Sequence, residues 1–183
     1  GFISLGTGND TVTFNVAAIS GTTLTSSDTI NISGNVIGGI TIDAAANSGD
    51  HAFLTGVNTV NFSAIGAGAQ VSFGSNNDLA TFQGAIGAGS IYGGAGDDTL
   101  AFNGAVISGA TIDQGQGSDS LYFASSLSGT TLTGSGADTI NLTNQNTVVF
   151  GALSTAASQV SFGSNNDMAT FSGAIGAGSI YGG

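Results

Sequence analysis

The chain has 183 residues and a formal net charge of −11 at pH 7, and all eleven charges are aspartates because lysine, arginine and glutamate are absent. Without cationic side chains the protein cannot neutralise phosphates, so nucleic acids and anionic membrane surfaces are excluded as partners by charge and cations are the expected ones. The absence of cysteine excludes a disulfide scaffold, and no apolar run is long enough to predict membrane insertion. An apolar content of 40% is sufficient for a buried core.

A glycine and aspartate turn motif, Gly-x-Gly-x-Asp-x followed by an aliphatic residue, recurs along the chain. Its clearest copy spans Gly93 to Leu100, and in two looser copies an asparagine replaces the second glycine. The residues that we predict to serve the motif are, in chain order, Gly6, Gly8, Asp10, Asp78, Gly94, Gly96, Asp98, Gly115, Gly117, Asp119, Gly134, Gly136, Asp138 and Asp167. Asp28 and Asp50 follow the same spacing in irregular turns.

Apolar residues alternate after each of these aspartates. Leu100 and Phe102, for example, are the second and fourth residues after Asp98. A period of two predicts a strand with one buried face. A second apolar pair, such as Ile107 and Ile112, follows across a small-residue corner that contains Ser-Gly or Ala-Gly. Each unit is therefore predicted to be a strand, a corner, a second strand and an aspartate turn.

The turn aspartates recur about every 20 residues, which is typical of a solenoid. We predict an all-β fold, a right-handed parallel β-solenoid of the β-roll type, with coils of about 20 residues and two facing parallel sheets. Aliphatic and phenylalanine ladders would fill the space between the sheets. Two gaps between aspartates are longer, and they contain Asn58–Phe62 and Asn146–Phe150. Each of these segments is either an extra strand or an enlarged corner.

A longer repeat of 89 residues overlies the short one. The segment 70–94 recurs at 159–183 with only two changes, Leu79 to Met168 and Gln83 to Ser172. We interpret residues 1–183 as one continuous solenoid of about two 89-residue super-repeats, with a boundary near 93/94. Because the sequence stops within a repeat, we expect it to be a segment of a longer chain or of a filament.

Calcium is the cofactor that these turns predict. Glycine allows backbone conformations with positive φ, so that carbonyl oxygens can converge in a turn. Calcium takes six to eight oxygen ligands and accepts carboxylates and carbonyls together. Stacked coils would place carboxylates about 5 Å apart, where they repel by roughly 3 kcal/mol at an effective dielectric constant near 20. A bound calcium ion would remove that repulsion.

The segment Gly93 to Leu100 resembles the calcium-binding nonapeptide of the RTX (repeats-in-toxin) family. The resemblance implies a parallel β-roll that folds with calcium and is secreted from bacteria to the cell exterior. RTX blocks repeat the motif every nine residues and bind calcium on both edges, whereas a spacing of about twenty leaves one edge for calcium. That spacing is similar to the calcium-bound solenoids of large bacterial adhesins, among them an ice-binding type, and to surface fibrils and surface-layer proteins.

The alternative for each motif aspartate is a residue that only caps its own turn through backbone hydrogen bonds. We interpret Asp43, Asp97 and Asp113 as solvated surface residues, and His51, the only imidazole, as a turn residue without a catalytic partner. No nucleophile with a neighbouring base is apparent. The chain is therefore predicted to be non-enzymatic.

The preferred functional hypothesis is a calcium-stabilised extracellular rod, part of a filament, sheath or surface layer, that associates with itself end to end or laterally. A second hypothesis is the repeat region of an adhesin or an ice-binding protein. Regular Thr-x-Asn pairs in the turns would favour ice, but only Thr7 and Asn9 provide one. A third hypothesis is the RTX block of a secreted toxin or enzyme.

Overall fold

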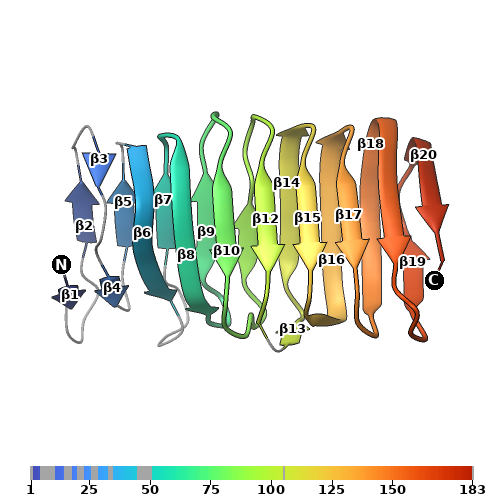
Figure 1. The fold of residues 1–183 in the computed structure, drawn as a ribbon, viewed down its shortest axis with the longest axis horizontal. Coiled ribbons are helices and arrows are strands. Elements are labelled where there is room, and N and C mark those ends of the chain that lie inside the picture. Colours follow the sequence, from blue (N-terminus) through green and yellow to red (C-terminus); the bar gives the residue numbers. More distant parts are fainter. Residues whose placement is uncertain are drawn as a thin grey trace.

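The computed structural model describes residues 2–4, 11–14, 18–19, 23–25, 29–32, 35–44, 51–104 and 106–182. All regular elements in these residues are β-strands, stacked side by side along one long axis (Figure 1). The described part of the chain contains no helix that could span a membrane.

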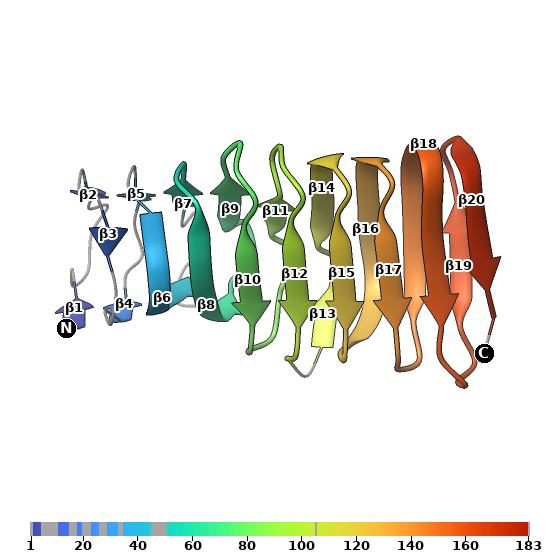
Figure 2. The ribbon, with the colours of Figure 1, turned by 45° about the horizontal axis from the view of Figure 1, so that its top comes forward.

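The strands form two parallel sheets that face each other (Figures 1 and 2). Sheet A consists of β1 (Phe2–Ser4), β4 (Thr23–Thr25), β6 (Asn35–Ala44), β8 (Asn58–Ile65), β10 (Leu79–Phe82), β12 (Thr99–Phe102), β15 (Ser120–Phe123), β17 (Thr139–Leu142), the end of β18 (Thr147–Phe162) and β20 (Ile175–Tyr181). Sheet B consists of β2 (Thr11–Phe14), β5 (Thr29–Ile32), β7 (His51–Leu54), β9 (Gln70–Phe73), β11 (Ser90–Tyr92), β14 (Thr111–Gly117), β16 (Ser126–Gly136), the start of β18 and β19 (Met168–Phe171). Two short strands, β3 (Ala18–Ile19) and β13 (Val106–Ser108), lie at the edges between the sheets.

The coils have the predicted length. In sheet A, Leu100 pairs with Ala80 in the preceding coil and with Leu121 in the next, at sequence separations of 20 and 21 residues. All the strand pairs are parallel, and corresponding turns of successive coils lie above one another. The predicted all-β solenoid with two facing parallel sheets is therefore confirmed.

The space between the sheets is filled by the predicted ladders. The phenylalanine ladder is formed by Phe62, Phe82, Phe102 and Phe123, whose rings are stacked with centroids 4.9, 4.7 and 4.5 Å apart. All four rings are buried. On sheet B, Val71, Ile91, Ile112 and Leu132 form a buried aliphatic ladder. One side chain of each kind per coil therefore builds a continuous core, in which buried aromatic and aliphatic surface supplies most of the stability.

The two long gaps between aspartates contain extra strands, not enlarged corners. The segment at Asn58 forms β8, which pairs with β10, and the segment at Asn146 begins β18, which pairs with β19. The coil length stays near 20 residues in these regions, since His51 of β7 pairs with Gln70 of β9. What changes across each gap is the sheet that receives the strand after the aspartate.

The super-repeat consequently returns on the opposite sheet. The segment Gln70–Phe73 lies in sheet B, and its copy Gln159–Phe162 lies in sheet A. Likewise, Leu79–Phe82 lies in sheet A while its copy Met168–Phe171 lies in sheet B. The physical reason is arithmetic, because a repeat of 89 residues corresponds to about four and a half coils of 20. Successive super-repeats are therefore related by a half turn about the long axis.

Candidate metal-binding column

Four motif aspartates form a buried column on one edge of the solenoid. We call this the upper edge; it contains the turns that lead from sheet B to sheet A, which lie at the top of Figure 1. The column consists of Asp78, Asp98, Asp119 and Asp138, each at most 3% exposed. Their positions immediately before β10, β12, β15 and β17 bring them into register, as the 20-residue spacing predicts.

A ladder of hydrogen bonds links these aspartates from coil to coil. The backbone N–H of Asp78 donates to Oδ1 of Asp98 at 2.9 Å, and the N–H of Asp98 donates to Oδ1 of Asp119 at 2.8 Å. The N–H of Asp119 donates to Oδ1 of Asp138 at 3.2 Å. Each aspartate therefore caps the neighbouring coil and not its own turn.

The other carboxylate oxygen of each aspartate has no partner. Oδ2 of Asp78, Asp98, Asp119 and Asp138 is buried and makes no hydrogen bond. A buried oxygen of this kind is costly unless a proton or a cation satisfies it. The column thus presents a row of hard oxygen atoms that need a positively charged partner.

Burial shifts the pKa values of this column upward. Burial raises the pKa of Asp98 to about 7, and the neighbouring carboxylates of Asp119 and Asp78 add to this effect, while the hydrogen bond from Asp78 N–H opposes it. Burial also raises the pKa of Asp78 and of Asp119 to about 6, and it raises the pKa of Asp138. Repulsion between neighbouring coils is thus part of the electrostatics of the turns, as the sequence suggests.

The motif glycines are required by the close stacking of the turns. A Cβ on Gly115 would lie 1.9 Å from the carbonyl oxygen of Gly94, and a Cβ on Gly136 would lie 1.5 Å from that of Gly117. Both residues have positive φ, +93° and +144°. Gly94 and Gly96 also have positive φ. No side chain is accommodated at these positions, and the turn carbonyls lie in rows along the edge.

The inner wall of the turns is polar at one further position. Gln114 is completely buried, and both polar atoms of its amide lack partners. A Cβ on Gly134 would lie 2.9 Å from Oδ2 of Asp138 and 3.0 Å from Oε1 of Gln114, so both oxygens face the same glycine. Gln114 occupies the place of Gly93 in the motif, which is the sequence signal that could have identified it.

A second, solvent-exposed column runs beside the first. Oδ1 of Asn77 accepts the N–H of Asp97 at 2.9 Å, and Oδ1 of Asp97 accepts the N–H of Ser118 at 2.8 Å. Asp97 is exposed, as predicted, but it also links two coils. This outer column is satisfied within the protein, unlike the buried one.

Asparagines precede the aspartates at two points. At the upper edge, Asn58 donates its backbone N–H (2.7 Å) and its Nδ2 (2.8 Å) to Oδ1 of Asp78. Asn146 makes the same two bonds to Asp167, at 2.8 and 3.0 Å. The asparagines lie one coil before their aspartates, a spacing that could have identified them. At the other end of the buried column, the N–H of Asp138 donates to the hydroxyl of Ser158 at 3.3 Å.

Asp167 lies on the opposite edge from the other described motif aspartates. It precedes β19 of sheet B, so its turn belongs to the lower edge, where chains pass from sheet A to sheet B. The expectation that calcium ligands occupy a single edge is therefore wrong, because the half-turn relation of the super-repeats moves the motif across. Oδ2 of Asp167 is also buried and unpartnered. The predicted ligands Gly6, Gly8 and Asp10 lie outside the described residues.

The described residues contain no group of three or more acidic or histidine side chains that could hold a metal ion by themselves. A cation at the upper edge would take carboxylate oxygens from the column and the remaining ligands from turn carbonyls or from Gln114. This mixture of hard oxygens fits calcium. The fit is supported by the unpartnered Oδ2 atoms and by the glycine wall that faces them.

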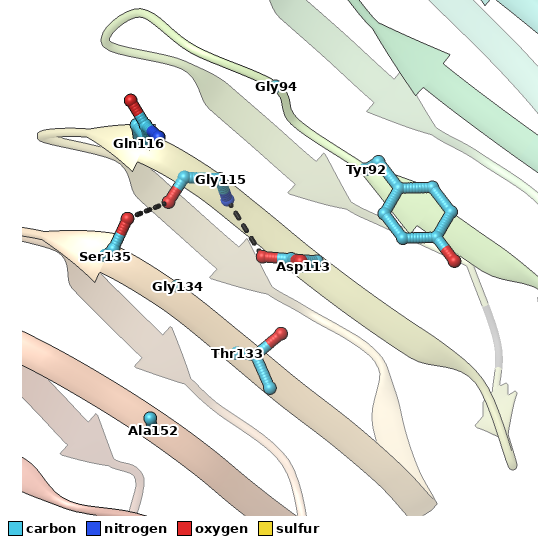
Figure 3. Close-up of a pocket in the computed structure, with 9 residues that line it drawn as sticks. All are labelled: Tyr92, Gly94, Asp113, Gly115, Gln116, Thr133, Gly134, Ser135 and Ala152. Carbon is cyan, nitrogen blue, oxygen red and sulfur yellow. Dashed lines mark hydrogen bonds between the residues drawn. The ribbon is translucent and has the colours of Figure 1, made fainter.

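A surface groove of about 510 Å³ lies beside the same turns on the outer face of sheet B (Figure 3). Tyr92, Asp113 and Thr133 line it, and the Ser135 hydroxyl donates to the carbonyl of Gly115 at 2.8 Å. Oδ1 of Asp113 accepts the N–H of Gly115 at 3.1 Å. The groove has one carboxylate, which is already partly satisfied, and it is separate from the buried column.

Comparison of the chain with protein-family models, with curated protein sequences and with solved structures finds no match. The stacked parallel coils are compatible with a β-roll, and the likeness to RTX repeats stays at the level of the turn motif.

Proposed function

We propose that this protein is a non-catalytic structural rod that calcium stabilises outside the cell. The observation that supports this most directly is the column of buried, unpartnered Asp Oδ2 atoms in a chain that has no cationic side chain except one histidine. Asp78, Asp98, Asp119 and Asp138 would contribute the carboxylate ligands, and the turn carbonyls of residues such as Gly94 and Gly96 would complete the shell. Bound calcium would neutralise the column and link successive coils.

The extracellular location follows from the same requirement. Sites of modest affinity, with dissociation constants of about 10⁻⁴ to 10⁻³ M, are filled by the calcium concentrations found outside cells and not by those inside. A solenoid that depends on calcium in this range would fold after export. Its regular backbone ladders and its apolar core suit a mechanical role in a filament, sheath or surface layer.

The test is a calcium titration of the metal-free protein at pH 7.5, followed by circular dichroism and by isothermal titration calorimetry. We expect saturable binding of several calcium ions and a large rise in Tm, with magnesium much less effective. Electron microscopy with calcium and after chelation would show whether rods lose their order. A protein that keeps its Tm and its rod shape in excess chelator, and binds no calcium, would refute the proposal.

A further inference from the structure

The half-turn relation between super-repeats gives the two outer faces of the solenoid the same residues. Six outward positions recur 89 residues later on the opposite sheet, as the register of the strands shows. These pairs are Gln70 and Gln159, Ser72 and Ser161, Leu79 and Met168, Thr81 and Thr170, Ser90 and Ser179, and Tyr92 and Tyr181. Whatever binds one face of such a rod finds the same residues on the other face.

The charges of the protein are kept away from these faces. Of the seven aspartates whose side chains the structure describes, six lie in the edge turns, and only Asp113 lies on a sheet face. The outward residues of sheet A from Thr59 to Tyr181 are uncharged, mostly threonine, serine and asparagine. Two chains of charge −11 can therefore approach each other through their faces, while approach through the edges brings like charges together.

Exposed aromatic side chains project from the same neutral surfaces. Tyr122 is 45% exposed on sheet A, and Tyr92 is 36% exposed on sheet B. Tyr181, the copy of Tyr92, is 53% exposed on sheet A. Tyrosine combines large apolar area with a polar tip and is enriched at protein interfaces.

From these observations we propose that both outer faces are docking surfaces for further copies of this chain, so that rods associate laterally on two opposite sides. The partner is a copy of the chain because the two faces carry the same residues and a shared charge excludes the edges. Such association would continue from copy to copy and build a layer. It rests on the proposed structural role, but not on calcium binding.

The area of the faces sets the strength of this association. Ten strands about 4.8 Å apart, each about four residues wide at ~3.3 Å per residue, give a face of roughly 600 Å². A pair of faces would bury about 1,200 Å², the lower limit for specific interfaces. Single chains of this length therefore associate weakly and reversibly, and longer rods would associate more strongly.

Cysteine trapping tests this proposal, because the chain has no cysteine of its own. The face variant carries Thr99→Cys on sheet A and Thr111→Cys on sheet B, and the matched edge variant carries Ser108→Cys and Ser118→Cys; all four positions are exposed. Both variants are oxidised in calcium buffer after circular dichroism has shown that they are folded. The products are separated on non-reducing gels.

We expect the face variant to form ladders of trimers and larger species, and the edge variant to remain monomeric. Adding Tyr92→Ser and Tyr122→Ser to the face variant is expected to reduce the ladder roughly tenfold. Equal ladders from both variants, no cross-linking of the face variant, or dimers alone would each overturn two-sided docking. Calcium affinity, measured on the same samples by calorimetry, reports separately on the proposed metal binding.

Discussion

Asp78 and Asp167 occupy equivalent positions in the 89-residue repeat, yet they lie on opposite edges of the solenoid. Each accepts two hydrogen bonds from an asparagine in the preceding coil. The same local sequence therefore builds the same turn twice, half a revolution apart. This relation determines where cations can bind and which residues each face presents, and it underlies the predictions that follow.

Asp98→Asn is expected to separate the metal-bound protein from the metal-free one. Asparagine keeps the oxygen that accepts Asp78 N–H but removes a negative charge from the column. Calcium affinity should fall by at least about tenfold, while the Tm of the metal-free protein at pH 8 should rise. The measurements are calorimetric titration and thermal unfolding in chelator. Asp97→Asn is the control, since Asp97 is exposed, and it should change neither quantity appreciably.

The stability of the metal-free protein is expected to decrease as the pH rises. The pKa values of Asp78, Asp98 and Asp119 are about 6, 7 and 6 in the folded chain, against 3.8 in the unfolded one. The folded state therefore binds protons more tightly, and this contribution is complete below about pH 4 and is lost as the pH passes through 6 to 7.

Thermal unfolding in chelator from pH 4 to pH 8 measures this dependence. The stabilisation by calcium should be largest at pH 8, where the column is fully ionised. A metal-free Tm that rises between pH 5 and pH 8 would contradict the buried, unpaired state of these carboxylates.

Gly115→Ala is expected to destabilise the stacked turns severely. The new Cβ would lie 1.9 Å from the carbonyl of Gly94, and φ at this position is +93°. We expect a loss of more than about 3 kcal/mol in the free energy of unfolding. Gly129→Ala is the matched control, because φ is +61° there and no atom lies within 4 Å of the new Cβ. It should cost only about 1 kcal/mol, the intrinsic penalty of the left-handed conformation. Chemical denaturation measures both.

Phe102→Ala is expected to break the aromatic ladder. The Phe102 ring is fully buried and stacks on Phe82 at 4.7 Å and on Phe123 at 4.5 Å. Its removal should reduce the free energy of unfolding by about 3–5 kcal/mol. Val106→Ala, at a residue that is 45% exposed, should have an effect below about 0.5 kcal/mol. Comparable losses from the two substitutions in denaturant titrations would contradict the described core.

Asn58→Asp is expected to lengthen the column by one carboxylate. The Asn58 amide now donates to Asp78, and a carboxylate in its place would repel Asp78 and require a cation. The variant should be less stable than the native protein in chelator at pH 8 and should recover with calcium. Asn146→Asp, the equivalent change at the lower edge, should behave alike. Calorimetric stoichiometry and Tm measure both, and a variant that is equally stable in chelator would argue against a charge-limited column.

The amino-acid sequence by itself determined the coil, because every part of the coil depends on local chemistry. Alternation at Leu100 and Phe102 predicts a strand with one buried face, and Gly94 and Gly96 predict a turn with positive φ; the structure confirms both. The 20-residue spacing likewise predicts the register that brings Asp98 beneath Asp119. These features repeat within one coil, so no information from distant parts of the chain is needed.

Only the tertiary structure decided how the repeats are placed around the axis. Whether an aspartate lies on the upper or the lower edge depends on the total number of residues between it and its neighbours, and a gap of 28 or 29 residues is compatible with an enlarged corner as well as with an extra half coil. Pairing of β8 with β10 and of β18 with β19 selects the half coil, because it lets every backbone N–H and carbonyl in these strands find a partner. The positions of Asp167, Gln114 and Tyr181 all follow from that pairing.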